Sequence, residues 1–587
     1  MSLDVEAIFH EIGDFGPYQR RIFFLLCLPA ILNAAANMAH LFTAGTPHYR
    51  CFVQDCDLNI TARNIYDSSF INYTIPLNDI DRKPATCSRF KRKSSKSYRK
   101  SCLPEDFTNE TEACFNGYVF DNSTFHSTIV TEFNLTCSSD WEIKAAQSVF
   151  FGGILVGSFL FGFISDLIGR KATIMIGIVG TTSTGITIAL IPNLLGFNIF
   201  RFFNAMMNTA IFQTAFVLGM EFVGTRWRVM MGVMGQYFFA LGEVLLGLIA
   251  WGLQDKDWRM LQLVVSVPTT CFIFYYWFIP ESVRWLISKG KTKKAICILE
   301  KVAKGNGVSI PQHFFNTQNE ENLQAREVNI ANDEISLISS PQTISSPQNL
   351  TMAHILCSPV LCVRMLSMFI VWIVTTLVYY GISLNSTNLG GPDSADKPFK
   401  DFILSSLVEI PGYTLAWLGM SQWGRKGSQI ASLILGGAAC ILAGYALETK
   451  IMNELIPALV GKCFITCAFA IIYVYTTEMF PTSVRNTILG LCSTFARIGG
   501  MMAPFSESLS SIYVPLPMLM FGGASVFAGI LSLIMPETLN TKLPDTLDEA
   551  INLGRNLELS LEVVESTEES QALLNENEDD EPEPVST

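Results

Sequence analysis

The sequence predicts an all-α membrane protein with twelve transmembrane helices in two six-helix halves. Three observations lead to this fold class: twelve apolar runs of helical length, charged motifs that recur at a constant spacing, and a long cysteine-rich polar segment after the first run. The composition agrees, because 49% of the 587 residues are hydrophobic and the mean hydropathy is +0.34. Such values are typical of a polytopic membrane protein.

Each apolar run is long enough to cross the ~30 Å hydrocarbon core of a bilayer as a helix. Arg20 and Arg21 precede the first run, and Arg170 and Lys171 lie in the short turn between the second and third runs. Because cytoplasmic loops are enriched in Lys and Arg, we expect the N-terminus and this turn to face the cytoplasm. The runs cover residues 22–43, 145–165, 172–191, 199–220, 230–252, 260–279, 365–384, 402–420, 428–447, 455–477, 488–509 and 516–535.

The two halves are predicted from repeated motifs. The hairpin sequence of residues 162–171 returns in a weaker form at residues 421–426, and two further motifs return in the same order. Three ordered matches at nearly one spacing indicate a duplicated unit. The matched residues are Gly169 and Gly424, 255 positions apart, Glu221 and Glu478, 257 apart, and Pro280 and Pro536, 256 apart.

The polar segment of residues 45–144 is predicted to be an extracellular loop. Its six cysteines suggest three disulfides, whose pairing the sequence leaves open, and its five Asn-x-Ser/Thr triplets are typical of N-glycosylation. The cysteines are Cys51, Cys56, Cys87, Cys102, Cys114 and Cys137. The acceptor residues are Asn59, Asn72, Asn109, Asn122 and Asn134.

These features divide the chain into four parts. Residues 1–285 form the N-terminal six-helix half with its extracellular loop, 286–362 a cytoplasmic linker, 363–545 the C-terminal half, and 546–587 an acidic, disordered cytoplasmic tail. The net charge of −12 is concentrated in this tail, so we expect no nucleic-acid partner. Leu573 and Leu574 follow acidic residues as in a dileucine signal for a sorting adaptor; a chance match in a Glu- and Leu-rich tail is the alternative.

Enzyme motifs are absent from the sequence. It has no Walker loop, no dinucleotide fingerprint and no His-Glu-x-x-His motif, and its six histidines lie in different segments. We therefore expect a protein that is not an enzyme and that needs no cofactor and no metal.

Charged residues in the middle of apolar runs are candidates for a binding site. Glu243, Glu409, Lys462 and Arg497 lie roughly 10–20 Å into their crossings, at about 1.5 Å of rise per residue. A charge at this depth costs at least ~2.5 kcal/mol, so each one should face a cavity or a partner. For Glu409 and Lys462, a purely structural ion pair is the alternative.

Aromatic and amide side chains accompany these charges. Tyr379 and Tyr380 lie in the seventh run, and Gln236 and Phe239 lie in the fifth. Aromatic faces beside polar groups suit organic cations or flat organic solutes. Ordinary packing in a membrane is the alternative for each aromatic residue taken alone.

The repeated motifs are predicted to form a cytoplasmic gate. Asp166 should accept hydrogen bonds across the seam between the halves. Glu221 should pair with Arg228, and the second-half copy should pair Glu478 with Arg485. Exposed pairs are worth about 0–1 kcal/mol, which suits a latch that must open; surface pairing without a gating role is the alternative. The gate candidates are Asp166, Gly169, Arg170, Lys171, Glu221, Arg228, Arg425, Glu478 and Arg485.

Several longer motifs resemble a known family. They are residues 13–20 (GDFGPYQR), 127–137 (STIVTEFNLTC), 280–285 (PESVRW), 380–390 (YGISLNSTNLG), 408–413 (VEIPGY), 536–540 (PETLN) and 543–549 (LPDTLDE). Together they resemble the major facilitator superfamily and, within it, the organic ion transporters of solute carrier family 22. The similarity is greatest to invertebrate organic cation transporters and to carnitine transporters.

This resemblance implies a twelve-helix transporter with a central cavity, a glycosylated first extracellular loop and no ATP hydrolysis. Two residues depart from the pattern. Ser421 replaces the acidic residue of the first-half motif, which implies a weaker second latch. Arg497 stands where cation-selective members carry Asp and where members for anions or carnitine carry Arg. By motif position, the residues that line or border the cavity are Gln236, Phe239, Tyr379, Tyr380, Glu409, Lys462 and Arg497.

We therefore expect a multi-pass plasma-membrane transporter that moves small organic ions by alternating access, with the substrate and membrane lipid as its partners. Zwitterions such as carnitine are favoured slightly over organic cations, with a carboxylate on the fork of Arg497 and an ammonium near Glu409 and the tyrosines. An organic anion transporter is the alternative, a sugar porter is less favoured, and a membrane receptor that does not transport is the alternative from another class.

Overall fold

The structure is a computed structural model of the 587-residue chain. It describes residues 5–57, 69–77, 84–93, 102–224, 227–308, 352–388, 396–449, 454–539 and 547–553, together with residues 66, 541 and 544. Residues 309–351 of the predicted linker and the tail from residue 554, with Leu573 and Leu574, lie outside the described residues. Asn59 and the side chain of Arg228 also lie outside them.

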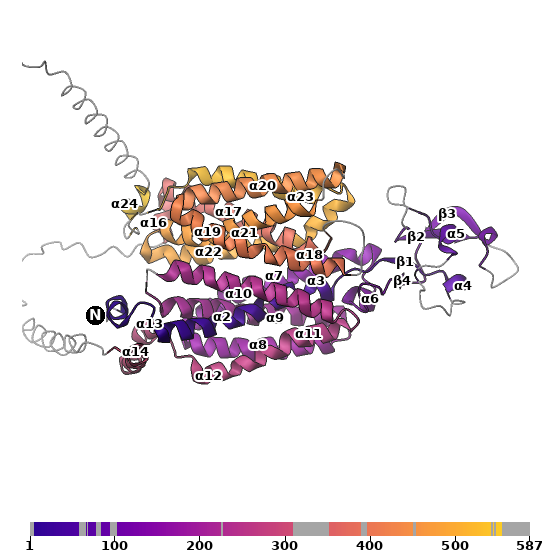
Figure 1. The fold of residues 1–587 in the computed structure, drawn as a ribbon. Coiled ribbons are helices and arrows are strands. Elements are labelled where there is room, and N and C mark those ends of the chain that lie inside the picture. The colour runs from indigo at the N-terminus through magenta and orange to yellow at the C-terminus, as the bar shows by residue number, and fades with distance from the viewer. Residues whose placement is uncertain are drawn as a thin grey trace, which may run out of the picture.

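Two helical bundles lie side by side, and the strands extend from one end of the pair (Figure 1). The first bundle contains α2 (Pro17–Met38), α3 (His40–Thr43), α7 (Asp140–Ile168), α8 (Arg170–Leu190), α9 (Leu194–Glu221), α10 (Arg228–Gly252), α11 (Trp258–Ser266), η4 (Val267–Phe274) and α12 (Tyr275–Phe278). The second contains α17 (Pro359–Leu384), α18 (Lys397–Leu407), α19 (Glu409–Gln422), α20 (Gly424–Thr449), α21 (Leu455–Met479), α22 (Thr482–Met502), η6 (Ala503–Ser511), α23 (Leu516–Leu531) and η7 (Ser532–Ile534).

Short helices cover the opposite end of the bundles (Figure 1). They are α1 (Val5–Ile12), α13 (Val283–Ser288), α14 (Thr292–Asn306), α16 (Met352–Cys357) and α24 (Leu547–Ile551). Asn306 of α14 joins this helix to α1 and to α2 of the first bundle, because its side chain donates to the Ile12 carbonyl at 2.9 Å and accepts a hydrogen bond from the Tyr18 amide at 3.1 Å.

Eleven helical spans among the described residues are long and apolar enough to cross a membrane. The remaining predicted run, residues 199–220, lies in α9, a helix of 28 residues that packs against α7 and α8. Arg201, Asn204 and Asn208 are buried in α9 and lower its hydropathy. The helical membrane fold is therefore confirmed, and the twelfth crossing stays a prediction.

The eighth predicted run contains a kink that positions the site. α18 ends at Leu407, and α19 begins at Glu409. Pro411 cannot donate a backbone hydrogen bond, and its ring crowds the carbonyl one turn earlier, which explains the interruption. As a result, the Glu409 carboxylate lies in the first turn of α19, where the helix dipole favours a negative charge.

The segment between α3 and α7 forms a small domain of strands and short helices, which we call the ectodomain after its predicted extracellular location. β1 (Tyr49–Cys51) pairs with β4 (Tyr118–Phe120) and β2 (Ser88–Arg92) with β3 (Phe107–Ala113), both antiparallel. Its short helices are α4 (Gln54–Asp57), α5 (Ile71–Thr74), η1 (Pro104–Asp106), α6 (Ile129–Phe133) and η2 (Cys137–Ser139). A buried ion pair, with Arg50 Nη2 2.8 Å from Asp57 Oδ1, and three disulfides supplement an apolar core that is small for a segment of this length.

The six predicted cysteines pair as Cys51–Cys114, Cys56–Cys102 and Cys87–Cys137. The disulfide bonds expected in this segment are thus present, with a pairing that the sequence left open. Four predicted glycosylation residues are described, and all are exposed: Asn72, Asn109, Asn122 and Asn134.

Candidate functional site

A cavity lies where the two bundles meet, and together with its opening it holds about 570 Å³. Residues from both bundles contribute to its wall, as a site at the interface of two repeats requires. The lining residues are Asn33, Asn37, Ile154, Thr209, Phe212, Gln236 and Phe239 from the first bundle, and Tyr379, Tyr380, Tyr413, Phe469, Tyr473 and Arg497 from the second.

Five of the seven residues predicted to line or border a cavity form part of this wall: Gln236, Phe239, Tyr379, Tyr380 and Arg497. The other two, Glu409 and Lys462, lie directly behind the wall. Both are fully buried, and the ring of Tyr379 covers the ammonium of Lys462 at 3.7 Å from its centroid.

Glu409 and Lys462 form an ion pair in which Nζ lies 2.7 Å from Oε1. The hydroxyl of Tyr379 donates to Oε1 at 2.8 Å, and that of Tyr413 donates to Oε2 at 3.1 Å. Lys462 also donates to the Ser383 hydroxyl. The structure therefore contains the Glu409–Lys462 ion pair, and its purely structural role stays a prediction.

This arrangement bears on where a substrate ammonium can lie. Its predicted place near Glu409 and the tyrosines stays a prediction. Glu409 is paired with Lys462 behind Tyr379, so the groups that the cavity presents on this side are aromatic rings. Tyr379 stacks on Phe469 with ring centroids 5.1 Å apart and packs edge to face on Tyr380, which gives a surface suited to cation–π contact.

Arg497 is the charged residue of the cavity wall. It forms no ion pair with any residue that the structure describes, and its Nε has no hydrogen-bond partner there. The hydroxyls of Tyr380 and Tyr473 lie in its electrostatic field. Gly499 positions this part of α22, because a Cβ there would lie 2.2 Å from the Ile373 carbonyl of α17. The guanidinium is therefore available to a carboxylate.

Sequence reasoning missed eight of the lining residues, among them two pairs at a helical spacing. Asn33 and Asn37 lie one turn apart on α2, and the Asn37 amide donates to Asn33 Oδ1 at 3.0 Å. Two amides at an i, i+4 spacing in an apolar run were a usable signal, because intramembrane polar residues face the bundle interior. Phe469 and Tyr473 share the same spacing on α21, but aromatic residues are too common in such helices to signal a site.

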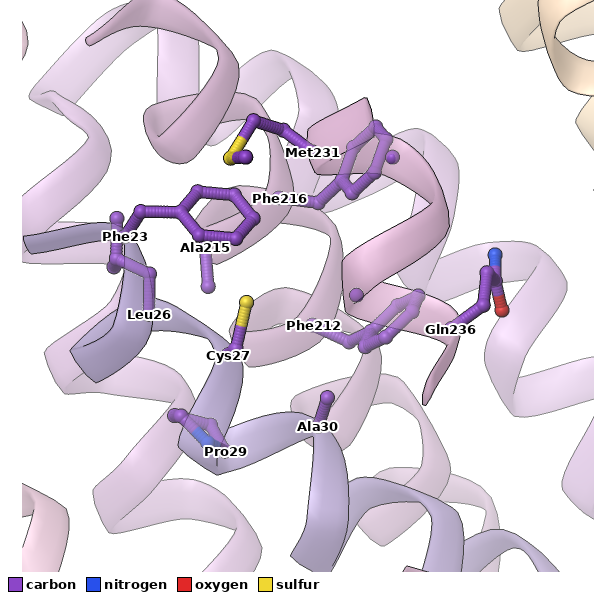
Figure 2. Close-up of a pocket in the computed structure, with 12 residues that line it drawn as sticks. Phe23, Leu26, Cys27, Pro29, Ala30, Phe212, Ala215, Phe216, Met231 and Gln236 are labelled. Carbon is purple, nitrogen blue, oxygen red and sulfur yellow. The ribbon is translucent and has the colours of Figure 1, made fainter. Parts of the chain in front are cut away.

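A second hollow of about 440 Å³ lies within the first bundle, between α2, α9 and α10. Figure 2 shows its mainly apolar lining, with the rings of Phe23, Phe212 and Phe216 and the amide of Gln236. Phe212 and Gln236 line both spaces. The two hollows therefore adjoin at these side chains.

The first gate motif is an ion-pair network around Arg170. Arg170 Nε and Nη2 donate to the two carboxylate oxygens of Glu221 at 3.2 and 3.0 Å, and Nη1 lies 2.9 Å from Asp166 Oδ1. Glu281 accepts the backbone amides of Arg170 at 2.9 Å and of Lys171 at 3.3 Å. A carboxylate at the start of α8 thus satisfies free N–H groups and complements the helix dipole.

The second gate motif repeats this geometry. Arg425 Nη2 donates to Glu478 Oε1 at 2.9 Å, and Glu537 accepts the amides of Arg425 at 2.8 Å and of Lys426 at 3.1 Å. Ser421, at the Asp166 position, bonds instead to the Leu418 carbonyl. The second network thus has no counterpart of the ion pair that Asp166 forms with Arg170 in the first.

Glycine begins both turns for one physical reason. Gly169 has φ +107° and Gly424 has φ +80°, a region that strains residues with a Cβ. A Cβ would also lie 2.4 Å from the carboxylate oxygens of Glu281 and Glu537. This shared constraint explains why the Gly-Arg-Lys triplet occurs in both halves.

Each gate acid binds the arginine of a Gly-Arg-Lys turn. Glu221 binds Arg170, and Glu478 binds Arg425. The expected contacts with Arg228, whose side chain lies outside the described residues, and with Arg485 stay predictions. Asp166 binds Arg170 of its own bundle instead of reaching across the seam.

The bundles contact each other at the end that carries the ectodomain. Phe42 stacks on Phe399 with centroids 5.3 Å apart, Ser148 Oγ donates to the Met501 carbonyl at 2.7 Å, and Trp251 Nε1 donates to Asp396 Oδ1 at 3.1 Å. Phe125 of the ectodomain packs on Phe399 as well. The cavity is therefore closed on this side by contacts between α3, α7, α10 and the second bundle.

Sequence comparison identifies the family. The family model described as "Sugar (and other) transporter" matches residues 61–546. This chain belongs to that transporter family. The match and the relatives confirm the predicted resemblance to the major facilitator superfamily and to solute carrier family 22, and they confirm that the protein is a multi-pass membrane transporter and not an enzyme.

Two relatives of this transporter illustrate the match. The "Organic cation transporter protein" of Drosophila melanogaster is 35% identical over 94% of this chain and 95% of its own length. The "Organic cation/carnitine transporter 2" of Homo sapiens is 32% identical over 94% of each chain. Among solved structures, the partially occluded inward-open xylose transporter XylE of E. coli covers 90% of this chain and all of its own, with a TM-score of 0.57 and 15% identity. This likeness establishes the fold.

Proposed function

We propose that this protein is a plasma-membrane secondary transporter that moves small organic ions by alternating access of its two bundles. The relatives named as organic cation and organic cation/carnitine transporters support this substrate class. Residues 1–285 and 363–545 would form the two moving halves, with α9 as the twelfth crossing. Residues 45–144 would be an extracellular, glycosylated loop, and residues 286–362 and 546–587 would be cytoplasmic.

The observation that carries the proposal is Arg497, which is half-buried in a cavity with an aromatic wall and forms no ion pair with the described residues. Such a cation attracts anionic groups and repels free cations. Aromatic faces attract an ammonium group. A zwitterion of the carnitine type satisfies both features, with its carboxylate on Arg497 and its ammonium over Tyr379, Tyr380 and Tyr473.

The other substrate classes fit the cavity less well. A simple organic cation would have to tolerate Arg497. An organic anion would use Arg497 but leave the aromatic wall without a cationic partner, and it is the second candidate. A sugar has no charge to neutralise the guanidinium, and a receptor without transport would not need the cavity.

Uptake into expressing cells tests the proposal. We would measure the initial uptake of radiolabelled carnitine, tetraethylammonium, an organic anion such as p-aminohippurate, and glucose, with the surface amount determined by biotinylation. Carnitine uptake should exceed the others and should be lost in Arg497→Ala, while Glu448→Gln at an exposed site should transport normally. Uptake of glucose alone, or of none of the four at normal surface amounts, would contradict the proposal.

A further inference from the structure

The buried acid Glu243 is not part of the proposed binding site. It lies in α10, its residue is 1% exposed, and its Oε1 has no hydrogen-bond partner among the described residues. α10 packs on α18 and α19, which carry Ser406 and Glu409, and the Glu243 carboxyl interacts with both side chains. An acid of the first bundle therefore meets an acid of the second, on the side of the cavity where the bundles are in contact.

The charges of this cluster do not balance if both acids are ionised. Lys462 neutralises Glu409 at 2.7 Å, so an ionised Glu243 would add a net negative charge to a cluster of buried side chains. Two carboxylates in contact disfavour each other's ionisation, and burial disfavours it further. The cluster is neutral when one proton is bound to the two carboxyl groups.

Hydrogen bonding leads to the same result. The Ser406 hydroxyl donates to the Phe402 carbonyl at 2.9 Å, so its one proton is used. Tyr379 and Tyr413 donate to Glu409. An ionised Glu243 can only accept hydrogen bonds, whereas a protonated one can donate. The acceptor that a protonated Glu243 faces is Glu409.

Apart from Lys462, whose charge also acts on Glu243, the described residues around α10 supply no counter-charge. Tyr379 and Tyr380 of α17 and Tyr413 of α19 are the further titratable groups that interact with Glu243. Helices α2, α9 and α11 also pack on α10, but none of their described residues brings a charge to the cluster. Arg497 acts on Tyr380 and Tyr473 instead.

We infer that the Glu243–Glu409 pair binds one proton while the ectodomain side is closed and releases it when the bundles separate on that side. This inference rests on the proposed function, because separation of the bundles is a step of alternating access. Once they are apart, Glu243 faces water and both acids ionise. Closure of the loaded transporter then takes up one proton from the outside.

A sodium ion is a poorer occupant of the same place. Hard cations are held by several oxygen ligands, and the Lys462 ammonium already lies against Glu409. A proton needs only the two carboxyl oxygens that face each other. The uptake experiment that follows distinguishes a bound proton from a bound sodium ion.

The first test is the pH dependence of uptake in Glu243→Gln, which mimics the protonated acid permanently. Initial uptake of carnitine and of tetraethylammonium would be measured from about pH 5.5 to about pH 8 outside, with the cytoplasmic pH clamped. Wild-type uptake should rise on acidification, by up to about tenfold per pH unit where one proton limits closure. Glu243→Gln should transport with a flat profile. Glu448→Gln, an exposed acid at the end of α20, should keep the wild-type profile.

Three outcomes of this test would overturn the inference. They are a flat wild-type profile, an unchanged profile in Glu243→Gln, and a loss of sodium dependence instead of pH dependence in that variant. Uptake of neither probe by the wild type would instead contradict the proposed function.

The second test does not depend on transport. Infrared spectra of the purified full-length protein report the carbonyl stretch of a protonated carboxyl group that is shielded from water. This band should be present at neutral pH, should be lost in Glu243→Gln and should remain in Glu448→Gln. An identical band in wild type and Glu243→Gln would overturn the inference even if no substrate is found.

Discussion

Lys462 and Glu409 form an ion pair that is buried completely: Nζ lies 2.7 Å from Oε1, and neither side chain is more than 1% exposed. The two residues come from α21 and α19 of the same bundle. Their charges cancel inside that bundle, so the pair persists when the bundles move relative to each other. Arg497, in contrast, has no such partner among the described residues and is left for the substrate.

The buried pair gives the first prediction. Lys462→Met should destabilise the protein by about 3–5 kcal/mol, because it leaves Glu409 charged and buried without a partner. The double change Glu409→Gln with Lys462→Met should recover much of this loss. Thermal unfolding of the purified protein measures both.

An exposed pair provides the control for this prediction. Lys400 lies 3.2 Å from Asp396, and its side chain is 55% exposed. Lys400→Met should therefore cost at most about 1 kcal/mol. Equal losses at the two lysines would contradict the assignment of a structural role to Lys462.

The second prediction concerns the charge preference of the cavity. Arg497→Asp should weaken substrates with a carboxylate and improve simple organic cations. Arg497→Lys should rescue only part of the carnitine affinity, because the charge remains but the bidentate fork is lost. Competition curves for carnitine and tetraethylammonium measure these effects. An equal loss for both substrates would mean that Arg497 supports the fold and does not select the substrate.

The third prediction concerns the two turns that begin with glycine. Gly169→Ala and Gly424→Ala should each reduce stability by at least about 1–2 kcal/mol, the cost of a positive φ for a residue with a Cβ, with a further loss from displaced Glu281 or Glu537. Gly427→Ala is the matched control, because its added Cβ meets no atom within 4 Å and alanine favours a helix. A stable, fully expressed Gly169→Ala variant would contradict this explanation.

The fourth prediction concerns the gate motif. Arg170→Ala removes the partner of both Glu221 and Asp166, whereas Asp166→Asn removes one contact of a side chain that is 73% exposed. Turnover should therefore fall in both variants, and more in Arg170→Ala, while the surface amount stays largely normal. Arg425→Ala tests the second network, which has no counterpart of Asp166. Normal uptake per surface molecule in Asp166→Asn and Arg170→Ala would remove the motif from the transport mechanism.

The fifth prediction concerns the ectodomain. Glycosidase treatment should increase the electrophoretic mobility of the protein from cells, and combined Asn→Gln changes at the five acceptor residues should abolish this shift. Asn349, in the predicted cytoplasmic linker, should carry no glycan. Glycosylation at Asn349 would contradict the predicted topology.

Much of this molecule could be predicted because the relevant signals are local in the chain. Hydropathy locates the apolar helices, since each crossing must bury its own backbone hydrogen bonds. The repeated Gly-Arg-Lys turns were recognisable because Gly169 and Gly424 meet the same backbone requirement. α9 shows the limit of this signal, because buried Arg201, Asn204 and Asn208 lower its hydropathy although the helix lies inside the bundle.

The sequence by itself determined the fold class, the duplicated architecture, the ectodomain cysteines and five of the residues around the cavity. Only the tertiary structure decided how the charges pair. Arg170 and Glu221 are 51 positions apart, and Arg425 and Glu478 are 53 apart, so each pair depends on which helices become neighbours. The same holds for Glu243, whose meeting with Glu409 requires two separate bundles to close on each other. A charge within an apolar run predicts that a partner or a cavity is needed. Which residue becomes that partner depends on how the helices pack.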